Sequence, residues 1–185
     1  MGRALEHLGF NVCGAVGLKE PNIAENIKRI AFEQVPNYDA FQDNPWPILF
    51  RDLDAAFPGS KFIMTRRDSD SWIRSVLRHF GSTPHAMQEW IYGVPYPNGN
   101  EQIFLDRYHR HEEEVLAYFS RRPDDLLILD IESEDLWSPL AGFLSLPPPT
   151  IPFPHTNKGG SGWKAARWAR RRMLRIKYRF ARTQQ

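Results

Sequence analysis

The sequence has almost no cysteine and no long apolar run. Cys13 is the single cysteine among 185 residues, so the chain can form no internal disulfide and has no cysteine cluster for a metal ion. No segment approaches the roughly 18 apolar residues that cross a membrane, and the opening stretch "MGRALEHLGF" lacks the apolar core that predicts a signal peptide. These absences argue against a disulfide-rich secreted domain and a membrane span, and we expect a cytoplasmic protein.

Acidic residues are missing from the end of the chain. Residues 1–157 carry 14 basic and 22 acidic side chains, a net charge of −8, whereas residues 158–185 carry 10 basic side chains and no acidic one, a net charge of +10. The formal charge of +2 for the whole chain therefore describes neither part. This asymmetry predicts an acidic domain over 1–157, followed over 158–185 by a Gly-rich loop and a basic amphipathic helix.

The basic segment 163–182 suits contact with an anionic surface. As a helix it has one narrow apolar face among its lysines and arginines, made by Ala166, Ala169, Met173, Ile176 and Phe180. That profile is typical of a helix lying on anionic lipid, and it also suits a phosphate backbone or docking on the acidic body. No nucleic-acid-binding module precedes it, so we expect no nucleic-acid partner and keep peripheral membrane contact as a candidate. The pattern leaves the oligomeric state open.

Strand-like and helix-like segments alternate along the acidic part. The apolar runs 62–65 ("FIMT") and 126–131 ("LLILDI") predict buried strands, and the periodic stretches 23–31 and 69–80 predict helices. Such alternation predicts parallel βαβ units and a three-layer α/β/α fold with a parallel sheet. In these folds ligands bind at the carboxyl ends of the strands, next to the N-termini of helices.

Two arginines stand where the strand 62–65 meets the next helix. Arg66 and Arg67 precede a helix start at Asp68 or Ser69, either of which can cap its first turn. An arginine presents a planar fork to phosphate oxygens, Ser75 adds a hydroxyl, and the helix N-terminus adds partial positive charge. The stretch therefore predicts an anion site. The alternative is a solvated arginine beside an ordinary helical serine.

The stretch "AFPGSKFIMTRRDSDSWIRSV" resembles the phosphonucleotide-binding segment of P-loop sulfotransferases, in particular the bacterial-type family. In that superfamily a strand-end arginine and a serine eight residues later hold the 3′-phosphate of 3′-phosphoadenosine-5′-phosphosulfate. The matching residues are Arg67 and Ser75, and Arg66 is an addition for which an ion pair with the acidic body is one explanation. The resemblance implies a P-loop NTPase-like fold and transfer of a sulfonate from that cosubstrate to a hydroxyl or amine. The implied acceptor is a small molecule or glycan, and no metal is implied.

Two flanking motifs extend the resemblance. Cytosolic sulfotransferases carry a catalytic histidine just before a proline turn, and the matching place in "QDNP" holds Asp43. A carboxylate there can take the proton of the acceptor, or it can simply hydrogen-bond the turn before Pro45. Farther on, "NKGGSGWK" resembles a late Lys-Gly-rich loop, which implies that Lys158 and Gly159 contact the same 3′-phosphate. A plain linker is the alternative for that loop.

The strand and loop that grip the 5′-phosphosulfate in this family have no counterpart in the sequence. "MGRALEHLGFNVCG" resembles the helix after that loop and the next strand, and no Gly-x-x-x-x-Gly-Lys-Ser/Thr occurs. We therefore expect a truncated family member that lacks its first strand and loop; a misassigned start, a fragment and a degenerate protein all fit. Because such loops supply much of the catalytic electrostatics, the alternative function is a non-catalytic member that binds a partner or membrane through its basic tail.

Two further regions carry candidate side chains. Residues 80–100 hold Trp90, Tyr92 and Tyr96, which either shape the acceptor pocket or close the core. His109 and Glu113 in "YHRHEEE" are four residues apart and can share a helix face, but no third ligand is in view. A solvated helix face is the favoured interpretation, so we expect no metal site.

Overall fold

The computed structural model describes residues 1–154, of which Met1–Phe153 form one unit. The predicted Gly-rich loop and basic helix over 158–185, with Lys158 and Gly159, lie outside the described residues.

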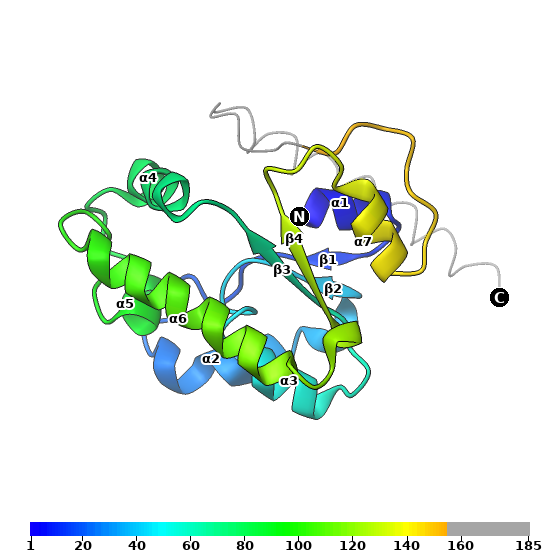
Figure 1. The fold of residues 1–185 in the computed structure, drawn as a ribbon. Helices are drawn as coiled ribbons and strands as arrows, with labels where there is room; N and C mark the ends of the chain where they lie inside the picture. The colour runs from blue at the N-terminus through cyan, green and yellow to red at the C-terminus, as the bar shows by residue number, and fades with distance from the viewer. Residues whose placement is uncertain (155–185) are drawn as a thin grey trace, which may run out of the picture. The chain divides into compact units, whose positions relative to one another are not determined.

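Four short strands form two parallel pairs. Strand β1 (Val12–Cys13) pairs with β2 (Ala40–Phe41), and β3 (Phe62–Arg66) pairs with β4 (Leu126–Asp130), as Figure 1 shows. The parallel pairing and the alternation with helices confirm the predicted α/β class. The expected single sheet is absent from residues 1–154, because no strand there hydrogen-bonds both pairs and the strand order stops at two in each sheet.

Helices precede, separate and follow these strands along the chain. Their bounds are α1 (Gly2–His7), α2 (Ile23–Phe32), α3 (Phe50–Ala56), α4 (Ser69–Phe80), α5 (Ala86–Tyr92), α6 (Glu101–Phe119) and α7 (Trp137–Phe143), with short 3₁₀ turns η1 (Val35–Asn37) and η2 (Pro123–Asp125). The predicted helices over 23–31 and 69–80 are confirmed as α2 and α4. Both carry a strongly amphipathic pattern, which explains why periodicity alone located them.

Alternate residues of β3 contact helices on opposite faces. Ile63 packs against a cluster from α1 and α7, whereas Phe62 and Met64 pack against side chains of α3 and α6. We call the first group the α1–α7 cluster; its buried members are Ala4, Leu5, Trp137 and Leu140. Val12 and Ala40 of the other strand pair contact the same cluster, so one group of apolar side chains joins both pairs.

Strand β4 is less buried than its apolar sequence suggests. Leu129 is only 2% exposed, but Ile128 is 40% exposed although both lie in the same strand. Within the described part of the chain, β4 pairs with β3 alone, so it is an edge strand there. The expectation of a buried strand over 126–131 is therefore met in part: Leu126 and Leu127 are partly buried against opposite clusters, Leu129 is buried and Ile128 is exposed.

A polar network ties α3 to the end of α6 and the turn after it. Asp54 is 8% exposed, and its carboxylate accepts a hydrogen bond from the Tyr118 hydroxyl (2.7 Å) and from both terminal nitrogens of Arg122 (3.2 and 2.6 Å). The Arg122 guanidinium also lies over the rings of Tyr118 and Phe119. The hydrogen bonds from Arg122, helped by that from Tyr118, hold the pKa of Asp54 below its ordinary value of 3.8.

Replacing Asp54 with asparagine should lower the free energy of unfolding at pH 7 by about 1 to 2 kcal/mol, because the charge-assisted bonds are lost while solvent already screens part of the ion pair. A lowered folded-state pKa means that the contribution of Asp54 is present above its unfolded pKa and disappears as the pH falls through the folded value. Urea titrations of wild type and Asp54→Asn should therefore converge as the pH drops below 3.8. A gap that stays constant from neutral to acidic pH would contradict this role of the carboxylate.

Candidate functional site

Helix α4 begins directly after the two arginines. Strand β3 ends at Arg66, and the Asp68 side chain caps α4 by accepting the Ser71 N–H at 2.8 Å. Of the two caps that the sequence allowed, the structure uses Asp68. Because the cap places the first turn of α4 immediately after Arg67, the arginine and the positive end of the helix dipole lie together.

Arg67 lies along the face of α4 that carries its serines. Its Nη2 donates to Ser71 Oγ at 2.9 Å, while its Nε is buried and has no hydrogen-bond partner among residues 1–154. Ser75 is half-buried and stands four residues after Ser71, which places the two serines one above the other on the helix. The structure thus brings Arg67 to the helix face of Ser75, but its direct partner is Ser71. Sequence reasoning missed Ser71, although the sequence shows that it lies four residues after Arg67 and four residues before Ser75.

Arg66 has a different partner. Its Nε forms an ion pair with the Glu112 carboxylate of α6, whose side chain is only 17% exposed. This is the ion pair with the acidic body that the sequence suggested for the additional arginine. The two adjacent cations are therefore separated: Arg66 is held by α6 and Arg67 faces α4.

Tyr108 of α6 contacts the main chain of Arg67. The Tyr108 hydroxyl donates to the Arg67 carbonyl oxygen at 3.1 Å and accepts from the Arg67 N–H at 3.5 Å. Its ring packs on Trp72 of α4 with the ring centroids 4.6 Å apart. No local pattern in the sequence pointed to Tyr108, because it lies 41 residues from Arg67 along the chain.

Asp43 occupies a constrained turn after β2. Its φ of 67° lies in the left-handed region, which aspartate tolerates better than most side chains do. The Asp43 carbonyl oxygen accepts the Trp46 N–H at 3.1 Å. Within residues 1–154 no hydrogen bond or ion pair joins Asp43 to Arg67 or Ser75. The turn role is therefore visible in the main chain, and the chemical role of the carboxylate stays a hypothesis.

The segment before Asp43 is tied to the start of α1. The Gln42 side chain accepts the Gly2 N–H at 2.6 Å, and a Cβ at position 2 would lie 2.7 Å from the same side chain. A glycine at this place therefore permits the close approach. As a result, Asp43 follows directly on a residue that is anchored to the N-terminal end of α1.

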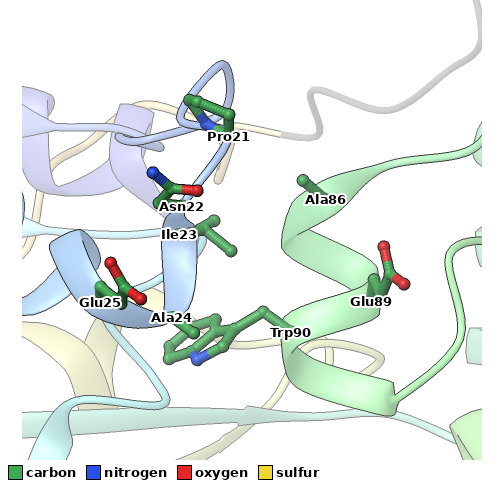
Figure 2. A pocket seen from close by; sticks show the side chains of 8 residues that line it. All are labelled: Pro21, Asn22, Ile23, Ala24, Glu25, Ala86, Glu89 and Trp90. Atoms are coloured by element: carbon green, nitrogen blue, oxygen red, sulfur yellow. The ribbon is translucent and has the colours of Figure 1, made fainter.

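The aromatic residues of segment 80–100 divide between two roles. Figure 2 shows the Trp90 indole extending from α5 toward α2, where it borders a hollow of about 310 Å³. The lining residues are Pro21, Asn22, Ile23, Ala24, Glu25, Ala86, Glu89 and Trp90. Tyr92 instead stacks on Phe104 with centroids 3.8 Å apart, and burial raises its pKa to about 12. Tyr92 therefore closes the core, whereas Trp90 both packs against a cluster of Ile23, Ile27 and Met87 and borders the hollow.

Among residues 1–154 there is no group of three or more His, Cys, Asp or Glu side chains that could hold a metal ion. In the same part of the chain, no helix has both the length and the apolar character to cross a membrane.

A family model described as "Sulfotransferase domain" matches the chain twice, over residues 1–94 and 77–161. No curated protein matches the chain. The matched segments include Asp43, Arg67 and Ser75, together with the whole β3–α4 turn. Because the two matches together span well over half of the sequence, this protein belongs to the sulfotransferase domain family.

Proposed function

We propose that this protein binds 3′-phosphoadenosine-5′-phosphosulfate through Arg67 and Ser75 and transfers its sulfonate to a hydroxyl or amine of a small-molecule or glycan acceptor. Family membership indicates sulfonate transfer in general. The observation that carries the proposal is the environment of Arg67, whose guanidinium lies along the serine face of α4 with a buried Nε that has no partner in the described residues.

The state of this guanidinium favours an anion. Among residues 1–154 its side-chain partner is a neutral hydroxyl and no carboxylate pairs with it, and Arg67 is only partly buried, so a phosphate could bind the part of the fork that solvent reaches. Ser71 already holds Nη2 of Arg67, so the fork is oriented before a ligand arrives. A 3′-phosphate would accept from Arg67 and from the Ser75 hydroxyl, next to the positive end of α4. Lys158 and Gly159, outside the described residues, are proposed to contact the same phosphate.

Asp43 is the proposed general base. In the transfer, the acceptor oxygen or nitrogen forms a bond to sulfur while the bond from sulfur to the bridging oxygen breaks. Asp43 takes the proton of the acceptor, and adenosine 3′,5′-bisphosphate leaves. Support comes from its place after β2 and from its left-handed main chain, since strained residues gather at functional sites.

The nucleotide site can be tested by comparing the two adjacent arginines. In calorimetric titrations with adenosine 3′,5′-bisphosphate, Arg67→Ala should weaken binding roughly 10- to 100-fold, because a charge-assisted hydrogen bond to phosphate is lost. Arg66→Ala is the matched control. It removes the same charge one residue earlier but breaks only the pair with Glu112, so affinity should stay within about threefold of wild type.

Either of two outcomes would contradict the proposed nucleotide site. One is that wild type does not bind the bisphosphate; the other is that both arginine variants lose affinity equally. The first result would favour the non-catalytic family member that acts through residues 163–182, and the second would show that Arg67 has no special role in binding.

The catalytic role of Asp43 calls for a substitution that leaves the turn intact. Asparagine also tolerates the left-handed region, so Asp43→Asn keeps the main chain and removes only the base. We expect transfer of radiolabelled sulfonate to a panel of hydroxyl and amine acceptors to slow by about 10²- to 10⁴-fold, with unchanged affinity for the bisphosphate. A transfer rate equal to that of wild type would show that Asp43 serves the turn alone.

A further inference from the structure

The main chain of Arg67 lies just beyond the last rung of its sheet. Pairing of β3 with β4 ends at Arg66 and Asp130, and the Arg66 carbonyl oxygen accepts the Ile131 N–H at 3.0 Å. The next residue, Arg67, has neither of its main-chain groups in that ladder. Its N–H and its carbonyl oxygen are both bonded to the Tyr108 hydroxyl, at 3.5 and 3.1 Å. The Tyr108 hydroxyl of α6 therefore bonds the main chain of the first residue beyond the paired strands.

The Tyr108 ring is held by a contact with α4, the helix that follows the turn. The ring contacts Trp72 at a centroid distance of 4.6 Å, and the Trp72 N–H donates to the Asp68 carbonyl oxygen in the first turn of α4. One turn farther along α6, Glu112 binds the side chain of Arg66. Helix α6 therefore contacts the residues on either side of the β3–α4 turn as well as Arg67 within it.

We propose that Tyr108 is a positioning residue for Arg67: by holding the main chain of Arg67 it directs the guanidinium along α4 toward Ser71 and Ser75. The direction of a side chain depends on its main-chain dihedrals, and a displacement of about 1 Å is enough to spoil a binding geometry. The role for ligand binding rests on the proposed function, whereas the effect on Arg67 itself does not.

The test uses Tyr108→Phe, which keeps the ring on Trp72 and removes only the hydroxyl. Calorimetry should show affinity for adenosine 3′,5′-bisphosphate falling roughly two- to tenfold, the range expected for the loss of a hydrogen bond. Affinity for adenosine 5′-monophosphate, which has no 3′-phosphate, should not change. In an Arg67→Ala background the same substitution should have no further effect, because the group that it positions is gone. Equal losses in both backgrounds would overturn the proposal.

Tyr118→Phe on the same helix is the matched control. It also removes one phenolic hydroxyl, in this case the donor to Asp54 at 2.7 Å. The control should reduce stability against urea and leave the bisphosphate affinity unchanged. If both tyrosine variants weaken binding to the same extent, a general loss of stability explains the effect and the positioning role is wrong.

A measurement without ligand separates this proposal from the proposed function. The Nε–H of Arg67 is buried in wild type, so its NMR signal should exchange slowly with solvent. In Tyr108→Phe we expect that exchange to become faster, while Tyr118→Phe should leave it unchanged. If wild type fails to bind the bisphosphate, the proposed function fails and the Nε–H signal still decides the positioning role. Unchanged exchange in Tyr108→Phe would overturn that role.

Discussion

Side-chain packing joins the two strand pairs of this protein, since no hydrogen-bonded ladder connects them within residues 1–154. The α1–α7 cluster contacts Val12 and Ala40 in one pair and Ile63 and Leu127 in the other. Burial of an aliphatic side chain contributes about 1.5 to 3 kcal/mol, so a few such contacts can hold the pairs together. The relation of Asp43, which follows β2, to Arg67, which follows β3, depends on this packing. If Asp43 and Arg67 serve one site, that site requires a well-packed α1–α7 cluster as much as the two residues themselves.

Helix α6 links stability to the candidate site. Near its end, the Tyr118 hydroxyl donates to the buried carboxylate of Asp54, and Arg122, just beyond the helix, donates to the same carboxylate. Nearer its start, Tyr108 and Glu112 contact the two arginines of the β3–α4 turn. The helix is 19 residues long, so contacts several turns apart share one rigid element. Different residues carry the two sets of contacts, so stability should be measured alongside binding in any variant of this helix.

The two adjacent arginines show how neighbouring cations acquire different roles. An ion pair with Glu112 holds Arg66, whose side chain is half exposed. Arg67 donates to a neutral hydroxyl and keeps one buried nitrogen without a partner in the described part of the chain. A guanidinium that is not neutralised by a carboxylate retains its attraction for an anion. This difference is why Arg67, and not Arg66, is the proposed ligand of the donor's phosphate.

The sequence alone determined those structural features that depend on residues close together in the chain. Four features were predicted because each rests on side chains within a few residues of one another: the apolar run of β3, the periodicity of α2 and α4, a cap at Asp68 or Ser69, and the arginines at a strand end. The choice of Arg67 over Arg66 as the partner of Ser75 came from the resemblance and stays a prediction. Tertiary structure alone decided that β1–β2 and β3–β4 form separate pairs within residues 1–154, that Ile128 is exposed, and that Tyr108 and Glu112 contact the arginines. These features join residues far apart in the chain, and no local periodicity or spacing encodes which distant side chain will arrive at a given strand end.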